Sequence, residues 1–322
     1  MQTLALCAVV LVSVGPACSL QEPQPGLVAF WCADRDAGWV HGVDEQLYVS
    51  RSMAVERPVF LESGPADSVW VVSANRGRDA PHGIHRIDPN AVRRGDPDAV
   101  SSVGSTPLHE VGAVLACAAE RGRLWFLERR LRGVVLSSVS AAGGLERRAA
   151  LPAAECLSAA AGRVAVGTRE ERLLIFETGA SASPLAPTAV HRLPGVPTHL
   201  RPGPAGQWWV ALSDPARLLL VHESAGMRWS RPSGLRDVLL GDGGVELEVV
   251  DALRGTRVVF DLAGVRSERE RLPLRGIAAG VRQVGRRLVY CSPGALYLLD
   301  ENSNRESTQG GFEFLADLIA AR

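Results

Sequence analysis

The sequence predicts an all-β fold, a β-propeller of about seven four-stranded blades, on three observations. A pair of short apolar strands joined by a turn recurs seven times along the 322 residues. The copies follow one another at nearly constant spacing, as in repeat architectures. Apolar residues alternate or run consecutively, without the sustained 3.6-residue period of helices.

The seven hairpins are rich in Val, Leu, Trp and Phe, and their turns carry Asp, Gly, Asn and Pro. They lie about 40 residues apart, except that 55 residues separate the second start from the third because the polar segment Pro89–Asp98 is inserted. The copies start at Val28, Val69, Leu124, Val164, Trp208, Leu247 and Leu288.

Further strands flank the hairpins and complete a four-stranded unit. Apolar segments precede them at Pro58–Leu61, Ala113–Ala116 and Ala278–Val281, and one follows at Ala189–Leu193. A lone sheet cannot bury both faces, whereas sheets packed radially cover each other. A β-sandwich also has many short strands, but it does not require the same hairpin seven times. The sequence therefore favours a propeller.

The two ends of the chain are expected to close the ring together. The first copy lacks a preceding strand, and the C-terminus holds a spare apolar segment, Phe312–Ile319. We predict that this segment completes the first blade. The alternative is a short amphipathic helix with Phe314, Leu315, Leu318 and Ile319 on one face.

The N-terminus has the features of an export signal. Leu4–Val14 is an apolar run too short to span a bilayer and typical of a signal-peptide core. We predict a signal peptide over 1–19, a linker over 20–26 and one propeller domain over 27–322. Gly15–Cys18 resembles a lipobox, which makes Cys18 the candidate lipidation site, and cleavage after Ser19 with simple secretion is the alternative. We expect a periplasmic or outer-membrane-attached protein, or a secreted one.

Composition excludes several classes of function. The formal net charge is zero, which leaves no electrostatic footprint for nucleic acid. All 35 basic residues are arginine, so neither a Schiff-base lysine nor a P-loop lysine exists. The four cysteines of the predicted domain are widely spaced, without CxxC, and are interpreted as buried small hydrophobes rather than bridges. They are Cys32, Cys117, Cys156 and Cys291.

A motif within the hairpins indicates a family resemblance. Val69–Val72 leads to Ile84–Asp88, and Leu296–Asp300 repeats the same ending. The pattern resembles bacterial β-propellers of the YVTN, NHL and PQQ-like type over nearly the whole predicted domain. No Gly-His/Trp-Asp pair recurs, as it does in WD repeats, and the docking motifs of quinoprotein dehydrogenases are missing. The resemblance therefore implies a fold and no quinone cofactor.

Several polar and aromatic residues are candidates for chemistry, but each has a simpler structural interpretation. His82 and His85 are three residues apart on a strand, so their rings point to opposite faces and form a poor metal pair. Trp208 and Trp209 likewise face opposite sides of a strand. We expect one of them in the core, and the other either in the core or facing solvent. The segment Glu128–Arg132 is predicted to form a solvated hairpin turn, and Ser213–Asp214 is interpreted as a pair of turn residues.

The sequence is compatible with two functions. Resemblance to propeller hydrolases and lactonases implies a divalent metal in the central channel, for which Glu62, Glu120, Glu155 and Asp317 are candidates near inner strands. Their positions within the repeat do not coincide, so we assign no catalytic, cofactor-binding or metal-binding residue and expect no cofactor. We favour a non-catalytic exported scaffold or ligand-binding module with an envelope protein as partner, attached to a membrane only through a lipid anchor.

Overall fold

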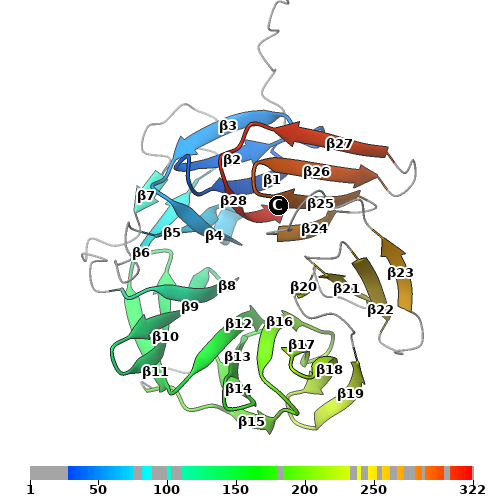
Figure 1. Ribbon diagram of the computed structural model, residues 1–322. Coiled ribbons are helices and arrows are strands. Elements are labelled where there is room, and N and C mark those ends of the chain that lie inside the picture. The colour runs from blue at the N-terminus through cyan, green and yellow to red at the C-terminus, as the bar shows by residue number, and fades with distance from the viewer. Residues whose placement is uncertain are drawn as a thin grey trace, which may run out of the picture.

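The computed structural model describes twelve segments of the chain, and seven antiparallel sheets of four strands form a ring (Figure 1). The described residues are 28–74, 82–88, 100–102, 111–179, 184–232, 238–240, 246–251, 256–261, 267–271, 280–284, 287–300 and 305–320. The expected signal peptide with Cys18, the linker and the insertion Pro89–Asp98 lie outside them. Within these segments no helix is both long and apolar enough to cross a membrane.

Each sheet runs from an innermost strand at the centre to an outermost strand at the rim. The first sheet holds β28 (Leu315–Ala320), β1 (Phe30–Asp34), β2 (Trp39–Val43) and β3 (Val49–Ala54). The second holds β4 (Pro58–Ser63), β5 (Val69–Ala74), β6 (His82–Ile87) and β7 (Val100–Ser102), with the 3-10 turn η1 (Pro65–Asp67) between β4 and β5. The third holds β8 (Val114–Glu120), β9 (Arg123–Arg130), β10 (Gly133–Ser140) and β11 (Leu145–Leu151).

The remaining four sheets repeat this order. The fourth holds β12 (Ala154–Ala160), β13 (Arg163–Thr168), β14 (Arg172–Glu177) and β15 (Ala189–Arg192), and the fifth holds β16 (Pro197–Pro202), β17 (Gln207–Ser213), β18 (Ala216–His222) and β19 (Gly226–Pro232). The sixth holds β20 (Val238–Leu240), β21 (Glu246–Asp251), β22 (Thr256–Asp261) and β23 (Ser267–Arg271). The seventh holds β24 (Gly280–Val284), β25 (Arg287–Ser292), β26 (Ala295–Asp300) and β27 (Arg305–Gly310). The seven predicted hairpins form the two middle strands of each sheet.

The ring is closed by strands from both ends of the chain. β28 pairs antiparallel with β1, with Phe30 opposite Ala320 and Cys32 opposite Leu318. The predicted closure is therefore confirmed, and the alternative of a C-terminal helix is wrong. Leu315 and Leu318 are fully buried against β25 and β26 of the seventh sheet, which explains why this segment is apolar.

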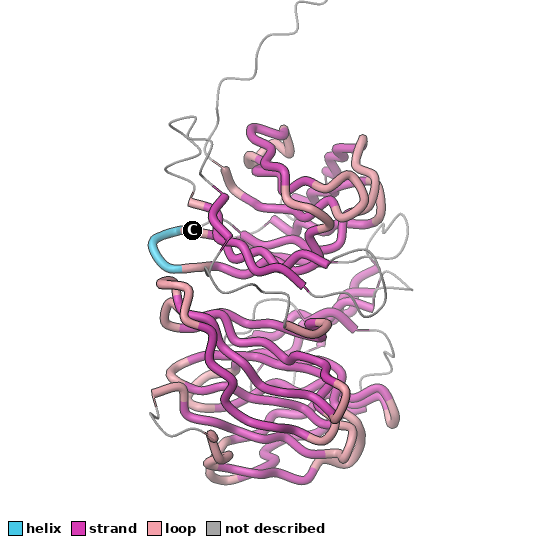
Figure 2. Tube along the Cα trace, turned by 90° about the vertical axis from the view of Figure 1, so that its left-hand side faces the viewer, coloured by secondary structure: helices cyan, strands magenta, loops and turns pink. Residues whose placement is uncertain are grey.

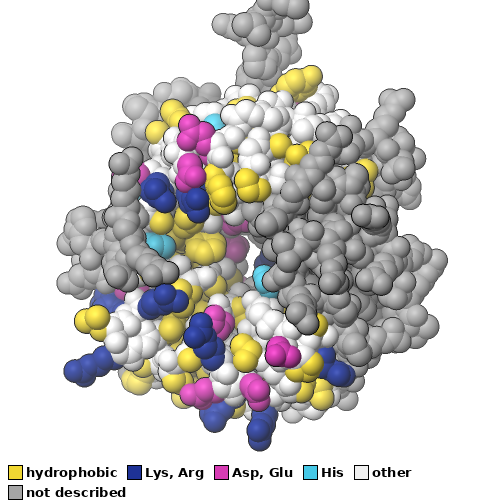
Figure 3. Space-filling view, viewed as in Figure 1, with side chains coloured by type: hydrophobic (Ala, Val, Ile, Leu, Met, Phe, Trp, Pro, Cys, Tyr) yellow, Lys and Arg dark blue, Asp and Glu magenta, His cyan; other side chains and the backbone are white. Residues whose placement is uncertain are grey.

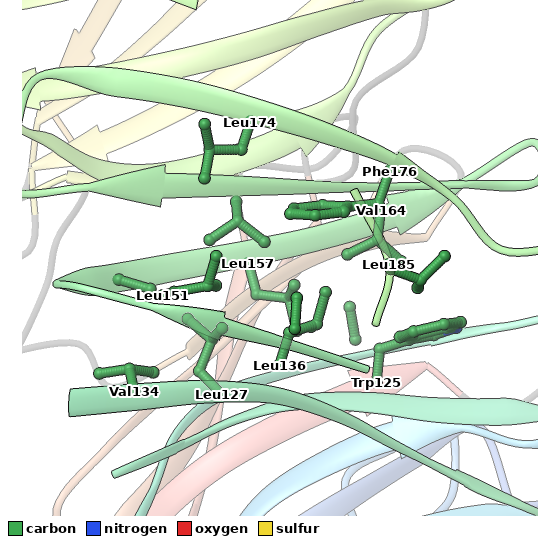
Figure 4. Packing of buried hydrophobic residues seen from close by; sticks show 14 residues of the cluster. Trp125, Leu127, Val134, Leu136, Leu151, Leu157, Val164, Leu174, Phe176 and Leu185 are labelled. Carbon is green, nitrogen blue, oxygen red and sulfur yellow. The ribbon is translucent and has the colours of Figure 1, made fainter. Parts of the chain in front are cut away.

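The core lies between neighbouring sheets rather than at one centre. Between the third and fourth sheets, Trp125, Leu127 and Leu136 pack against Val164 and Phe176 (Figure 4). Trp208 and Trp209 are both buried, so both belong to such layers and neither faces solvent. Inter-sheet burial explains why middle strands are apolar on both faces.

A buried polar residue lies at the end of the second strand, or within two residues of it, in five sheets. These residues are Asp34, Ser73, Glu128, Thr168 and Ser292. Asp34 and Glu128 accept hydrogen bonds from the backbone leading into the innermost strand of their own sheet. In these two sheets the polar residue therefore attaches the segment just before the innermost strand to the second strand.

Candidate ligand site in the central channel

The innermost strands line the centre of the ring and all begin on the same face. The turns of the middle hairpins lie on that face too, because strands within each sheet alternate in direction; we call it the hairpin face. The turn η1 lies on the opposite face, away from the viewer of Figure 1 (Figure 2). Figure 3 shows the hairpin face with an opening at the centre of the ring.

A β-bulge near the start of five innermost strands gives them a common register. The pairing shifts by one residue at Val59, Leu115, Glu155, Thr198 and Ala316. Counted from this bulge, Asp317 and His199 hold the first following position. Glu62 and Arg201 hold the third.

The four carboxylates predicted near inner strands all lie on innermost strands, but at four different positions. Glu155 is the bulge residue of its strand, and Asp317 is the first residue after the bulge of its own strand. Glu62 is the third residue after its bulge, and Glu120 is the fifth. They therefore do not form one layer. Among the described residues, no group of three or more His, Cys, Asp or Glu side chains could hold a metal ion.

Two of these carboxylates join neighbouring elements near the ends of the channel. Glu155 forms an ion pair with Arg169, next to the hairpin turn of its own sheet. Glu120 accepts hydrogen bonds from the backbone N–H of Gly162 at 2.7 Å and the hydroxyl of Thr178 at 3.4 Å. These contacts connect the third sheet to the fourth and account for Glu120 structurally.

The other two carboxylates, Glu62 and Asp317, act electrostatically on the thiol of Cys117 together with an arginine. Burial, followed by the charges of Glu62 and Asp317, raises the pKa of Cys117 well above its usual range, and Arg201 opposes this shift. Cys117 lies on β8, whereas Asp317 and Arg201 lie on sheets that do not adjoin that sheet. Their charges therefore act on the thiol through the space around the channel.

Asp317 is held in place by the backbone. Its Oδ2 accepts the N–H of Leu61 from the neighbouring β4 at 2.8 Å, and its Oδ1 accepts the N–H of Leu318 at 2.8 Å. The arrangement fixes a negative group at the channel wall.

The remaining candidates have structural partners. His82 Nδ1 accepts the N–H of Val114 from the next sheet at 3.3 Å, and His85 Nε2 lies 3.0 Å from Ser73 Oγ. Burial lowers the pKa of both histidines. They face opposite sides of β6, which agrees with the prediction from their spacing.

The cysteines largely match their interpretation as buried hydrophobes. All four are free thiols, and three are fully buried in the layers between sheets. Cys117 is the partly exposed one, and it packs against the hydrophobic layer between the second and third sheets. The sequence did not indicate that the charges of Glu62, Asp317 and Arg201 act on this thiol, because the four residues come from four different sheets.

Comparison with known proteins shows the fold alone. No model of a known protein family matches the sequence, and no curated protein matches it either. The structure resembles apo AztD from Citrobacter koseri with 14% identity and a TM-score of 0.57, covering 93% of this chain and 89% of that one. It resembles virginiamycin B lyase from Staphylococcus aureus with 13% identity and a TM-score of 0.57, covering 79% and 84%.

A third similar structure is a protein from Lactobacillus plantarum, with 12% identity and a TM-score of 0.62, covering 91% of this chain and 99% of that one. The similar structures are β-propeller proteins. The comparisons therefore agree with the β-propeller fold that the hairpin repeat predicts.

Proposed function

We propose that this chain is a non-catalytic exported propeller that binds a protein of the cell envelope through the tip of the β9–β10 hairpin. Leu131 at this tip is a fully exposed leucine on the hairpin face. Leu131 is the most exposed of the large apolar side chains that the structure describes, and its position beside exposed arginines is the observation that carries the proposal, because protein interfaces combine an apolar centre with a polar rim and are enriched in arginine.

The charges around Leu131 favour an acidic partner. Arg129 and Arg132 flank it, are exposed, and form no ion pair within the described residues. Arg130 instead pairs with the buried Glu128. Arginine is enriched at protein interfaces, where its planar group pairs with carboxylates. The partner surface that fits is an apolar pocket bordered by Asp or Glu.

The structure of the tip suits a docking element. Glu128 is fully buried and accepts the N–H of Gly112 at 2.7 Å and the hydroxyl of Ser137 at 3.3 Å. A side chain at Gly112 would collide with the carbonyl oxygen of Arg129. The base of the hairpin is thus tightly packed, and little ordering entropy would be lost on binding.

The alternative of a propeller hydrolase or lactonase has less support. Its metal would need converging carboxylates, whereas Glu120 and Glu155 are engaged in structural contacts and all four candidates differ in depth. We therefore favour binding over catalysis.

The test places a photo-crosslinking residue at position 131 of the full-length protein in its native envelope. A matched control places it at Val190, which is also apolar and exposed but lies on the outermost strand β15. We expect one stoichiometric partner crosslinked from 131 and not from 190. The double variant Arg129→Glu/Arg132→Glu should abolish it. Equal crosslinking from both sites, or none, would reject the proposal.

Export and anchoring are part of this proposal. We propose that residues 1–19 direct export and that Cys18 carries the lipid that holds the protein at the outer membrane. Fractionation compares the wild type with Cys18→Ala. Membrane retention of the wild type and release of the variant to the periplasm support lipidation. An identical soluble distribution indicates simple cleavage.

A further inference from the structure

One face of the first sheet leaves an aromatic ring open to solvent. Trp39 on β2 is 39% exposed, toward the rim of the ring (Figure 1). Its side chain has no hydrogen bond, ion pair or ring contact among the residues that the structure describes. The five other tryptophans whose burial is described are almost completely enclosed, and they are Trp31, Trp70, Trp125, Trp208 and Trp209. Trp39 is therefore the one of these six indoles that a ligand can reach.

The strand register places two polar side chains next to this ring. Trp39 lies directly opposite Ala54 of β3, and His41 lies directly opposite Ser52. Residues two apart on a strand point to the same face, and cross-strand neighbours on that face are in contact range. These four residues therefore form one patch, which we call the Trp39 platform. Ser52 and Ala54 are exposed and His41 is half-buried. The methyl group of Ala54 covers little of the indole, which explains why the ring stays open.

The polar half of the Trp39 platform is held in a fixed position. His41 Nδ1 lies 2.7 Å from Ser52 Oγ. The imidazole also packs edge-on against Phe312, with the two ring centres 5.4 Å apart. Within this contact each polar side chain uses one of its hydrogen-bonding groups, so the Nε2 atom of His41 and the remaining capacity of the Ser52 hydroxyl can serve a ligand. Groups that are already oriented lose little freedom when a ligand binds.

The Trp39 platform carries no net charge. Burial lowers the pKa of His41 below its usual value, and the charge of Asp34 only partly opposes this, so the imidazole is neutral at pH 7. Arg35 and Asp36, in the turn just before Trp39, form an ion pair with each other at 2.9 Å. An open aromatic ring beside an uncharged hydroxyl and imidazole fits a neutral ligand that has both an apolar face and hydroxyl groups.

We propose that the Trp39 platform binds a neutral saccharide, with one pyranose ring stacked on the indole of Trp39. A β-linked glucose or N-acetylglucosamine unit holds its substituents equatorially, so its axial C–H groups form flat apolar faces. The negative face of the indole attracts these C–H groups. Hydroxyl groups at the edge of the sugar would then bond to Ser52 and His41. The proposal goes beyond the protein partner at the hairpin tip and does not depend on Leu131.

Titration of the full-length protein with cellotetraose and with chitotetraose, followed by saturation-transfer NMR, tests the proposal. Mannitol is the comparison probe, because it is rich in hydroxyl groups but has no ring to stack. We expect at least one tetrasaccharide to bind with a Kd of about 1 mM or tighter, with saturation transferred most strongly to its axial ring protons. Mannitol should show no saturable binding. Failure of both tetrasaccharides to bind, or equal binding of mannitol, would overturn the proposal.

Variants in one hairpin assign the contacts. Trp39→Ala should weaken binding by about tenfold or more, and Ser52→Ala by about threefold, through the loss of stacking and of one hydrogen bond. Tyr48→Ala is the matched control, since Tyr48 is an aromatic residue that is 59% exposed but lies at the other end of the β2–β3 pair. It should leave binding unchanged. Equal losses in Trp39→Ala and Tyr48→Ala would reject the site.

Chemical footprinting of the wild type gives a readout that does not require any variant to fold. N-bromosuccinimide oxidises accessible tryptophan, and peptide mass spectrometry locates the product. Trp39 should be oxidised in the free protein, and a saturating concentration of the bound tetrasaccharide should protect it while mannitol does not. Protection of Trp39 supports the proposal. Binding of the saccharide without protection of Trp39 would place the sugar elsewhere and overturn it.

Discussion

The carboxylate of Asp34 accepts a hydrogen bond from the backbone N–H of Phe314 at 2.8 Å, across 280 residues of sequence. The same carboxylate accepts the N–H of Glu313 at 2.9 Å, and the guanidinium of Arg35 lies 4.0 Å from the centre of the Phe314 ring. These contacts attach the C-terminal strand to the first sheet. Their contribution to ring closure can therefore be measured by substituting Asp34.

Asp34→Ala should lower the free energy of unfolding by about 1–3 kcal/mol, because the backbone N–H groups of Glu313 and Phe314 lose the charged acceptor of two partly buried hydrogen bonds. Urea denaturation measures this. The control is Asp36→Ala in the same turn, where the carboxylate is exposed and pairs only with Arg35, so the expected change is below about 0.5 kcal/mol. Equal effects of the two variants would show that Asp34 does not stabilise the attachment of the C-terminal strand to the first sheet.

Removal of residues 312–322 should destabilise the protein sharply. The truncation deletes two fully buried leucines, Leu315 and Leu318, each worth about 2–5 kcal/mol, and exposes the edge of β1. We expect Tm to fall by about 10 °C or more. A chain ending at Ala320 is the control. A synthetic peptide spanning 312–320 should restore part of the loss, and an unchanged Tm in the truncated chain would contradict closure.

Stability should fall as the pH drops below neutrality. Burial lowers the pKa of His82, so the unfolded chain binds the proton at higher pH than the folded chain does. The free energy of unfolding is therefore greatest above the unfolded-state value of about 6.5 and is lost as the pH falls through it. Protonation would also cost the hydrogen bond that Nδ1 accepts from Val114.

The variant His82→Asn tests this link, since its amide oxygen can still accept that bond but does not titrate. Between pH 7.5 and 5.5 it should lose less stability in urea than the wild type. The loss that remains is expected to include His41 and His85, whose pKa values burial also lowers. A loss identical to that of the wild type would show that His82 does not contribute.

The buried thiols should resist alkylation in the native state. Burial raises the pKa of Cys156 to about 12 and that of Cys32 well above its usual range. Thiolate is the reactive form, so almost none is present at pH 8. Iodoacetamide followed by peptide mass spectrometry should modify these cysteines only in denaturant. Rapid native labelling of either would show that the layers between sheets open.

The sequence alone determined the repeat, the strand content and the closure. The hairpin pattern is local, and the alternation of apolar residues follows directly from the two-residue period of a strand. The spare segment Phe312–Ile319 could be assigned to the first sheet because that sheet otherwise lacked a strand. The core positions of the middle strands followed from the same pattern, although the pattern did not decide whether both Trp208 and Trp209 are buried or only one of them.

The surroundings of Cys117 were decided only by the tertiary structure. Glu62 and Asp317 were recognised as candidates, but Arg201 was not, because these residues lie far apart in the sequence and on different sheets. Their depths in the ring depend on bulges that shift the register by one residue, and the sequence pattern does not mark those bulges. Closing seven sheets into a ring is what brings distant strands to one axis. A local pattern can therefore predict each blade, whereas a site between blades exists only once the ring is formed.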